Sequence, residues 1–315
     1  DPYLCSFIFQ PDGTLVPQTG VRVGLAPSGA VIGGNGDPFL CCDQLPITPR
    51  LDRYNVNLLV HFEVSPPLVP YVEAKFSRTD SLGGSQSGPV FISGGTLGDP
   101  LGFLGGRNRE AIYLDNPFLT DQARTVICEQ RALSGLDCDP ATASINLRQS
   151  LLGLGTRQEE ARRDTFRIVG GIRGDLGSSW NYEVSATYGQ LKEKTKVLGN
   201  LDIQRFLLAN DPVVDPDSGN IVCRSQIDPD AAFGYYPWLY GVLFPGGPTP
   251  GDPNGAAKLA DDVSQCVPVG PMGGNFTEAQ KDYLLYDSVT KGKTKQFDVL
   301  AFISGDSSKW FELPG

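Results

Sequence analysis

The chain has 315 residues, of which 38 are glycine and 25 are proline, and hydrophobic residues make up only 40%. This wealth of turn-forming residues disfavours long helices and predicts an all-β fold. Acidic residues outnumber basic ones by 36 to 26, and the net charge of -10 makes nucleic acid an unexpected partner, because phosphate backbones require clustered positive charge. No apolar run approaches the roughly 20 residues of a membrane-spanning helix. No signal peptide opens the chain at Asp1, so we expect a mature or truncated segment.

Two turn signals near the start of the chain predict small hairpins. The run FIFQPDGTLV has Pro-Asp-Gly between extended residues, and VRVGLAPSGAVIGG has Pro-Ser-Gly in the same place. These residue types favour tight turns. The later run VVDPDSGNIVCR has the same form, and we interpret its centre as a hairpin turn because it lacks the ligand order and terminal Glu of a calcium-binding EF-hand.

The first strongly alternating segment covers residues 54–79. The run YNVNLLVHFEV places Tyr54, Val56, Leu58, Val60 and Phe62 on one face. The other face carries Asn55, Asn57, Leu59, His61 and Glu63, which are polar apart from the leucine. After a short SPPLVP turn, YVEAKFSRT sets Val72, Ala74 and Phe76 against Glu73, Lys75 and Ser77. The two runs predict an antiparallel hairpin.

A second alternating segment covers residues 165–198. Phe166, Ile168, Gly170 and Ile172 alternate with Arg167, Val169, Gly171 and Arg173. A turn is predicted at Gly177, Ser178 and Ser179. Beyond the turn, Trp180, Tyr182, Val184, Ala186 and Tyr188 share one face, opposite Asn181, Glu183, Ser185 and Thr187.

A third alternating segment covers residues 292–315. Phe297, Val299, Ala301 and Ile303 alternate with Gln296, Asp298, Leu300 and Phe302. The run GDSSKW then repeats the earlier GDLGSSW, with Trp310 in the place of Trp180. The chain ends at Gly315 just after a new strand begins, so we expect a truncated hairpin and an architecture with internal repeats.

The connections between these strands differ in length at their two ends. At one end they are short turns, beside which Trp180, Trp310 and Tyr71 would form an aromatic girdle. At the other end they run for about eighty to ninety residues, against a usual loop of about 4 to 6. Short helices are predicted near residues 120–131, 201–209, 256–264 and 277–286, with Thr120 and Thr277 as N-caps.

The seven cysteines all lie in turn-rich stretches, which favours disulfides and an oxidising compartment. We predict the pairs Cys128–Cys138 and Cys223–Cys266, and leave open whether Cys5 pairs with Cys41 or Cys42. The absence of a CxxC pair and the single histidine argue against a metal site.

Catalytic chemistry has little support in the sequence. His61 is the only imidazole, and no Ser or Cys nucleophile is tied to it by a motif. The acid pairs Glu159-Glu160 and Asp261-Asp262 lie in polar segments where carboxylates are usually solvated, and they stay unassigned. We expect no catalytic residue, no cofactor and no enzyme activity.

The run AAFGYYPWLYGVLFPGG is unusually aromatic for a solvent-exposed loop. Its aromatic residues are Phe233, Tyr235, Tyr236, Trp238, Tyr240 and Phe244. Such side chains stack on sugars or apolar rings, so they are candidates for binding an extracellular ligand. Packing of the loop on itself is an equally weighted alternative.

Many short segments resemble, in order, the barrel region of TonB-dependent receptors, in particular the group found in sphingomonads. They include RVGLAPSG, VIGGNGDP, RYNVNLLVHFEVSP, LDNPFLTDQAR, YEVSATYG, LGNLDIQRFLLA, DPDSGNIVCRSQ and KGKTKQFDVLAFISGDSSKWFELP. The resemblance covers nearly the whole chain and includes no motif that identifies a ligand. It implies a barrel of about 22 strands in the bacterial outer membrane, with a plug domain and a TonB-contacting box that lie outside this chain.

The resemblance implies a partial transmembrane β-barrel with long structured extracellular loops. The hairpins would be residues 54–79, 165–198 and 292–315, and the loops residues 1–53, 80–164 and 199–291. Side chains on a membrane barrel alternate between lipid and lumen. The expected lipid-facing residues are Tyr54, Val56, Leu58, Val60, Phe62, Phe166, Ile168, Ile172, Trp180, Tyr182, Val184, Phe297, Val299 and Ile303. The expected lumen-facing residues are Asn55, Asn57, His61, Glu63, Glu73, Lys75, Arg167, Arg173 and Glu183.

The implied function is import of a scarce solute, such as a siderophore or an oligosaccharide, energised through TonB. The expected partners are outer-membrane lipid, the TonB complex and an extracellular small-molecule or glycan ligand. Two alternatives stay open: a passive porin-like channel, and a secreted soluble β protein, of sandwich or propeller type, that binds or cleaves carbohydrate. The soluble protein would bury the apolar residues of its strands under a second layer.

Overall fold

The computed structural model describes residues 6–23, 30–36, 48–86, 90–92, 97–103, 105–233, 253–270, 272 and 274–306. The structure is mostly β, as the composition predicts, and its sheets are not closed. The chain divides into two compact units. Unit 1 comprises residues 1–45, 86–157 and 199–286, and unit 2 comprises residues 46–85, 158–198 and 287–315.

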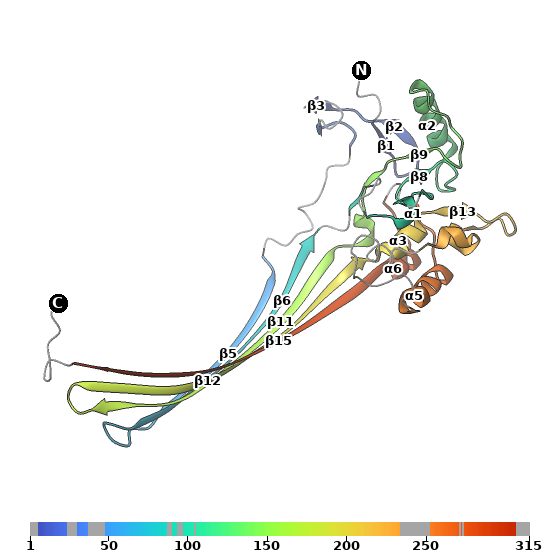
Figure 1. Ribbon diagram of the computed structural model, residues 1–315. Coiled ribbons are helices and arrows are strands. Elements are labelled where there is room, and N and C mark those ends of the chain that lie inside the picture. The colour runs from blue at the N-terminus through green and yellow to red at the C-terminus, as the bar shows by residue number, and fades with distance from the viewer. Residues whose placement is uncertain are drawn as a thin grey trace. The chain divides into compact units, whose positions relative to one another are not determined.

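Unit 2 is built on one five-stranded sheet, whose strands lie side by side in the order β15-β12-β11-β6-β5 (Figure 1). The strands are β5 (Arg50–His61), β6 (Val69–Gln86), β11 (Arg157–Leu176), β12 (Trp180–Leu201) and β15 (Leu285–Gly305). The pairs β5–β6 and β11–β12 are antiparallel hairpins, as the alternating segments predict. The predicted turn between Leu176 and Trp180 is confirmed, and Gly177 takes the positive φ of 74° that this tight connection requires.

The strands are longer than the alternating patterns predict, so the expected boundaries at 79, 165 and 292 are wrong. The hairpins continue through charged segments because the pairing places opposite charges in contact across strands. Arg78 forms an ion pair with Asp164 at 2.7 Å, and Arg163 forms one with Glu193 at 2.7 Å. The long connections are correspondingly shorter and run over residues 87–156 and 202–284.

Unit 1 contains small hairpins and short helices. The three predicted hairpins are confirmed: β1 (Phe7–Phe9) with β2 (Leu15–Pro17), β3 (Val21–Val23) with β4 (Ala30–Ile32), and β13 (Pro212–Val214) with β14 (Ile221–Cys223). Two further pairs were not predicted: β7 (Val90–Ile92) with β10 (Arg148–Ser150), and β8 (Ile112–Tyr113) with β9 (Ser144–Ile145).

The four predicted helices are also confirmed. They are α2 (Asp121–Leu133), α3 (Ile203–Ala209), α5 (Pro253–Ser264) and α6 (Glu278–Leu284), and α1 (Pro100–Phe103) adds a single turn. The hydroxyls of Thr120 and Thr277 accept hydrogen bonds from Ala123 and Gln280 backbone N–H groups, as N-caps do. In the described part of the chain, every helix is too short or too polar to cross a lipid bilayer.

The three segments of unit 1 share one hydrophobic core, which the sequence did not predict. Leu15 comes from the first segment, Ile112 from the second and Phe206 from the third, and all are buried. The side chain of Gln122 ties the first two segments together, because its amide accepts from Leu15 N at 2.7 Å and donates to Leu15 O at 2.9 Å. The long connections therefore form one folded unit instead of separate loops.

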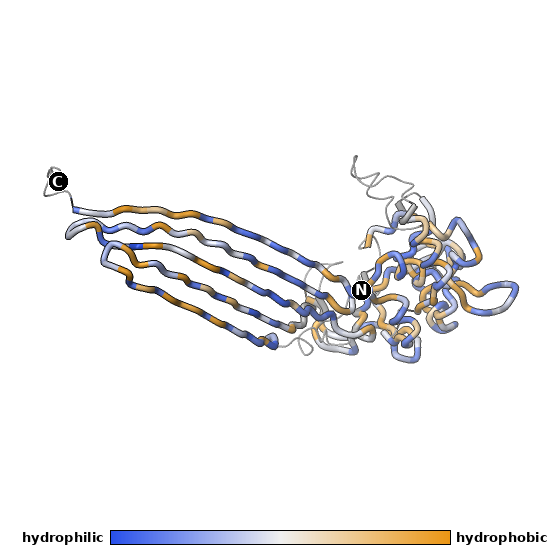
Figure 2. The backbone as a smooth tube through the Cα atoms, turned by 90° about the horizontal axis from the view of Figure 1, so that it is seen from below, coloured by the Kyte–Doolittle hydropathy of each residue, from blue (hydrophilic) through white to orange (hydrophobic). Residues whose placement is uncertain are grey.

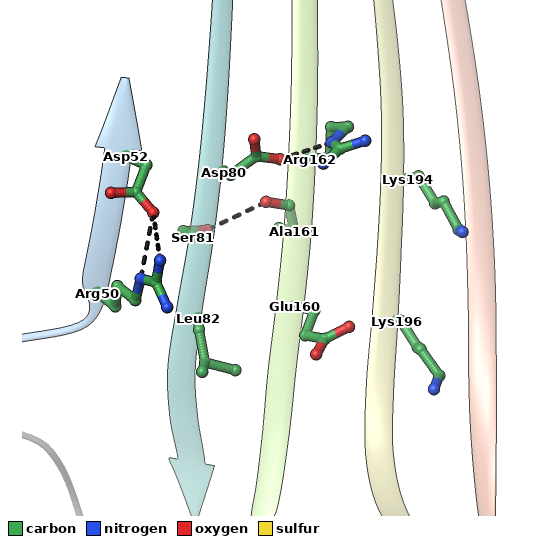
Figure 3. Close-up of a pocket in the computed structure, with 10 residues that line it drawn as sticks. All are labelled: Arg50, Asp52, Asp80, Ser81, Leu82, Glu160, Ala161, Arg162, Lys194 and Lys196. Atoms are coloured by element: carbon green, nitrogen blue, oxygen red, sulfur yellow. Dashed lines mark hydrogen bonds and ion pairs between the residues drawn. The ribbon is translucent and has the colours of Figure 1, made fainter. Parts of the chain in front are cut away.

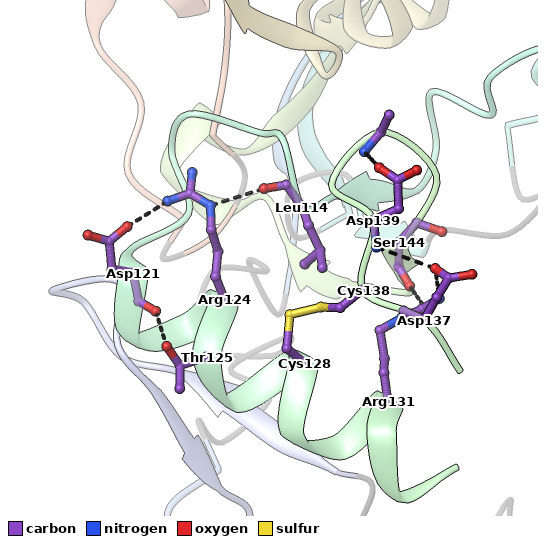
Figure 4. Close-up of a disulfide and its surroundings, with 11 residues drawn as sticks. Leu114, Asp121, Arg124, Thr125, Cys128, Arg131, Asp137, Cys138, Asp139 and Ser144 are labelled. Atoms are coloured by element: carbon purple, nitrogen blue, oxygen red, sulfur yellow. Dashed lines mark hydrogen bonds and ion pairs between the residues drawn. A yellow bond between two sulfur atoms is a disulfide. The ribbon is translucent and has the colours of Figure 1, made fainter. Parts of the chain in front are cut away.

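Both predicted disulfides are confirmed. Cys128 on α2 is bonded to Cys138, with 5.5 Å between their Cα atoms (Figure 4). Around this bond, Arg131 donates to the backbone oxygen of Asp137 at 2.6 Å. Cys223 at the end of β14 is bonded to Cys266 beyond α5, with 6.2 Å between their Cα atoms. Cys5, Cys41 and Cys42 lie outside the described residues.

Candidate functional site

The two faces of the unit 2 sheet differ in chemistry, and the strand pairing places the alternating apolar residues of each hairpin on one face. Direct partners on one face include Val56 with Phe76, and Ile172 with Val184. The ends of the same face carry Leu176 opposite Trp180. On β15, Ala301 and Ile303 line a shallow apolar hollow together with Tyr182 and Val184, which places these residues of β12 and β15 near one another.

Many apolar side chains of this face are exposed, which is unusual for a folded sheet. The exposed fraction is 63% for Val56, 54% for Leu58 and 68% for Phe297. Among the described residues, no second layer buries these positions. A water-soluble sandwich would bury such a face, because exposed apolar patches beyond a few hundred Å² mark a surface that contacts something else.

Each apolar stretch of this face covers only part of its strand. They run from Tyr54 to Phe62 on β5 and the turn after it, from Phe166 to Leu176 on β11, from Trp180 to Tyr188 on β12, and from Phe297 to Ile303 on β15. The first three are 9, 11 and 9 residues long, which matches the roughly 9 to 11 residues with which a tilted strand crosses a bilayer. The stretch on β15 has 7 residues, and the one on β6, from Val72 to Phe76, has 5. The strands continue beyond these stretches into charged segments, and Figure 2 shows the change from orange to blue along β15.

The opposite face of the sheet is mainly polar. Asn57 is the direct partner of Lys75, His61 of Tyr71, and Arg173 of Glu183. Ser77 donates a hydrogen bond to Asn55 at 2.7 Å. Arg167 lies opposite Gly189 on this face, Glu73 lies opposite Leu59, and Glu63 follows the end of β5. Leu59, Leu300 and Phe302 are exposed apolar residues that depart from the polar pattern.

Tyr71 corrects one expectation. The sequence placed it beside the short turn as part of an aromatic girdle, but its register puts it on the polar face with His61. Its hydroxyl donates a hydrogen bond to Glu183, and the guanidinium of Arg173 lies 5.5 Å from its ring centroid. The sequence could have predicted this placement, because Tyr71 is separated from Glu73 and Lys75 by two and four positions and therefore shares their face of β6.

Beyond the apolar stretches, the first face becomes charged. Arg162 on β11 and Asp80 on β6 point toward one another and form an ion pair at 2.6 Å (Figure 3). Arg50 and Asp52 pair within β5 at 3.1 Å. These groups surround a shallow hollow of about 460 Å³, which Glu160, Lys194 and Lys196 also line. The alternating lysines of LKEKTK and KGKTK were not singled out in the sequence, although their spacing predicts one charged face.

In the described part of unit 1, two ion-pair networks join three or more charged side chains, and sequence patterns did not identify them. In one, Arg224 contacts Asp115 at 2.7 Å and Asp211 at 3.2 Å, and Arg107 contacts the same two carboxylates. These contacts link the second and third segments of unit 1. Because the four charges neutralise one another, this network is a structural clamp and a poor candidate for binding a charged ligand.

The second network surrounds Asp262, whose side chain is buried. Arg205 reaches it at 2.7 Å and Gln204 donates to it at 2.6 Å, while Lys258 also pairs with it. Burial opposes ionisation of Asp262, but the hydrogen bonds from Lys258, Arg205 and Gln204 outweigh burial and hold its pKa below the ordinary 3.8. Burial together with the charge of Asp262 raises the pKa of Tyr283. Asp262 is therefore a structural residue, whereas its neighbour Asp261 is exposed.

The remaining candidates can be placed in part. Phe233 is half-buried at the end of η3 (Pro229–Ala232), whereas Tyr235, Tyr236, Trp238, Tyr240 and Phe244 lie outside the described residues, as does Trp310. The run from Asp215 to Asn220 is the turn between β13 and β14, as predicted. The Ser218 hydroxyl donates to Asp215 at 2.5 Å and lowers the pKa of that carboxyl.

Comparisons with models of protein families, with curated proteins and with solved structures gave no match. We therefore infer function from the faces of the sheet and from the resemblance of the sequence segments. The sheet offers an apolar face with many exposed side chains, a mainly polar opposite face, and a charged continuation of the apolar face.

Proposed function

We propose that the unit 2 sheet is part of a transmembrane β-barrel of the TonB-dependent receptor type, which imports a scarce solute across the bacterial outer membrane. The observation that carries this proposal is the exposed apolar face, which on three strands has about the length of a bilayer-spanning segment, backed by a polar face. Lipid would cover the first face and the barrel lumen would wet the second.

Closure of the sheet follows from the physics of a bilayer. Hydrocarbon offers no partner for backbone N–H and C=O groups, so a sheet within it must have no free edge. In the described chain, β5 and β15 are the outer strands of the sheet. Further strands are needed to close the ring, and the resemblance implies about 22 in total.

The lengths of the connections support an orientation of the sheet in the membrane. The turns after β5 and β11 are short, whereas the connections from β6 to β11 and from β12 to β15 are long and folded. Outer-membrane barrels have short periplasmic turns and long extracellular loops. Unit 1 would therefore lie on the extracellular side, where an oxidising environment suits its two disulfides.

Import is favoured over catalysis because of what the sheet and its connections supply. A polar lumen offers a path, and the folded extracellular unit offers a surface for capture of a siderophore, an oligosaccharide or a similar solute. The aromatic run at residues 233–244 is the candidate capture segment, and TonB would act through a plug domain that the resemblance places outside this chain.

The membrane part of the proposal can be tested with a matched pair of variants in the complete protein. Leu58 and Leu59 are adjacent and both exposed, but they lie on opposite faces of β5. Arginine facing lipid near the bilayer centre costs about 2 to 4 kcal/mol, whereas arginine facing water costs little. Leu58→Arg should lower the amount assembled in outer membranes, and Leu59→Arg should not. Equal effects of the two substitutions would refute a lipid-facing surface at Leu58.

The transport part requires uptake measurements. A deletion strain should lose uptake of one solute among ferric siderophores, cobalamin, oligosaccharides and aromatic plant compounds, and the restored gene should recover it. Collapse of the proton-motive force should abolish that uptake. Uptake that survives the collapse would indicate a passive channel, and partition of the protein into buffer without detergent would indicate the secreted soluble alternative.

A further inference from the structure

The register of β12 and β15 places two sets of lysines on one face of the sheet. Lys196 on β12 pairs with Asp287 on β15 at 2.9 Å, and a Cβ atom on Gly305 would lie 2.2 Å from the ring of Trp180. Side chains alternate along a strand, so odd-numbered residues of β15 share a face with even-numbered residues of β12. Agreement at both ends of the strands shows that the alternation is unbroken between them.

We call the resulting surface the lysine face. It comprises Lys192, Lys194, Lys196, Lys291, Lys293 and Lys295. The three on β15 are exposed, as are Lys192 and Lys194. Among the described residues, only Lys196 of this set has an ion-pair partner within 4 Å, and that partner is Asp287.

The acidic residues on neighbouring strands neutralise only part of the lysine face. Glu160 and Asp164 on β11 lie opposite Lys196 and Lys192, but Asp164 already forms a bidentate pair with Arg78. Arg162 lies directly opposite Lys194 and is itself paired with Asp80 on β6, so no carboxylate of β11 lies directly opposite Lys194.

The lysine face continues directly into the apolar face. On β15 the same side of the strand carries Lys291, Lys293 and Lys295 and then Phe297 and Val299. On β12 it carries Tyr188 and then, after Gln190, Lys192 and Lys194. A lipid has this same order of chemistry along its length, with an anionic headgroup next to hydrocarbon.

We propose that the lysine face docks phosphate-bearing lipid headgroups of the outer leaflet, an inference that rests on the membrane placement of the sheet. Clusters of four to eight basic residues at a membrane boundary attract anionic headgroups. Several lysines along two strands suit a row of headgroups, each held by short-range charge contacts that salt weakens. A nucleic acid or an acidic protein would not account for the apolar continuation.

The test uses the complete protein in detergent micelles, with bound lipids counted by native mass spectrometry. The probes are phosphatidic acid, zwitterionic phosphatidylcholine and inorganic phosphate. The wild type should prefer phosphatidic acid by about tenfold or more. A variant with Lys192, Lys194, Lys291 and Lys293 changed to Gln should lose that preference, and the same four positions changed to Arg should keep it. Lys75→Gln, on the opposite face, is the control and should behave as the wild type.

Three results would overturn the inference. An unchanged preference in the Gln variant would show that lipid binds elsewhere, and equal binding of both lipids by the wild type would show no selectivity. Competition by millimolar inorganic phosphate would indicate a site for a free anion. Failure of the membrane proposal is distinguishable, because the protein would then remain in buffer without detergent and Leu58→Arg would have no effect on assembly.

Discussion

The ring of Tyr71 on β6 covers the backbone of Gly171 on β11 so closely that a Cβ atom at position 171 would lie 2.7 Å from the ring. The hydroxyl of Tyr71 at the same time donates to Glu183 on β12. One aromatic side chain thereby joins three neighbouring strands. A glycine covered by a cross-strand aromatic residue is a known device for pinning strand register.

Substitution of Gly171 tests this contact. Gly171→Ala should force the Tyr71 ring to move, break its hydrogen bond to Glu183 and lower the free energy of unfolding by about 1 to 3 kcal/mol. Gly170→Ala is the matched control, because nothing lies within 4 Å of a Cβ atom there. Thermal unfolding of the complete protein in detergent measures both. Adding Tyr71→Ala should remove most of the Gly171→Ala effect, and full additivity of the two changes would contradict the contact.

The disulfides should differ in their effect on unit 1. Cys223 and Cys266 are separated by 43 residues, whereas Cys128 and Cys138 are separated by 10. Chain entropy predicts a loss of about 4 kcal/mol when the longer loop is opened, and about 3 kcal/mol or less for the shorter. Replacement of each pair by serine, followed by proteolysis of unit 1 in increasing urea, should give this order of stability. The opposite order would mean that strain or residual structure in the unfolded chain dominates.

Asp262 should give unit 1 an acid-sensitive stability. Its folded pKa lies below 3.8, so its stabilising contribution is present above that pH and is lost as the pH falls through the folded pKa. Asp262→Asn should lower stability at pH 7 by about 3 kcal/mol, because Arg205 and Lys258 lose their common partner, and should flatten the decline below pH 4. Urea unfolding from pH 2 to 7 measures both effects. Asp261→Asn, at the exposed neighbour, should leave the pH profile of the wild type, and an unchanged acid limb in Asp262→Asn would assign that limb to other carboxylates.

Lys258 should contribute at the alkaline end of the same profile. Burial opposes its charge, but hydrogen bonds to Asp262 and Asp202 outweigh burial and raise its pKa above the ordinary 10.5. Its contribution is therefore complete below that pH and is lost as the pH rises through the folded pKa. Lys258→Met should flatten the stability profile above pH 10 in urea unfolding. A persistent alkaline limb in that variant would exclude Lys258 as its source.

The link between Gln122 and Leu15 should control the first hairpin of unit 1. Gln122→Ala leaves the backbone N–H and C=O of Leu15 without their side-chain partner, at an expected loss of about 1 to 3 kcal/mol. Hydrogen exchange at the Leu15 amide should accelerate accordingly. Glu129→Ala, at an exposed position on the same helix, is the control and should not change that amide. Unchanged protection in Gln122→Ala would show that the hairpin is held by other contacts.

The sequence predicted features that depend on local patterns. The alternation of apolar and polar residues predicted the hairpins of unit 2, and turn-forming runs such as Pro-Asp-Gly predicted the small hairpins of unit 1. Thr120 and Thr277 predicted the starts of two helices. Each of these signals is contained within a few residues, where turn geometry, capping and period alone decide the structure.

Features that depend on which segments meet were not predicted. The strands continue past their apolar stretches because Arg162 finds Asp80 on a strand 82 positions away in the sequence. The shared core of unit 1 depends on the meeting of Leu15, Ile112 and Phe206. The periodicity within one segment does not show which other segment it contacts. In contrast, the faces on which Tyr71 and the lysines lie could have been predicted from the sequence, because side chains alternate along a strand.

The common core of unit 1 also constrains how such a protein can diversify. Leu15, Ile112 and Phe206 belong to one core, so replacing one of the three segments alone would mismatch its core residues with those of the other two. Sequence variation would then accumulate in exposed turns such as the one from Asp215 to Asn220, or through replacement of all three segments as a set.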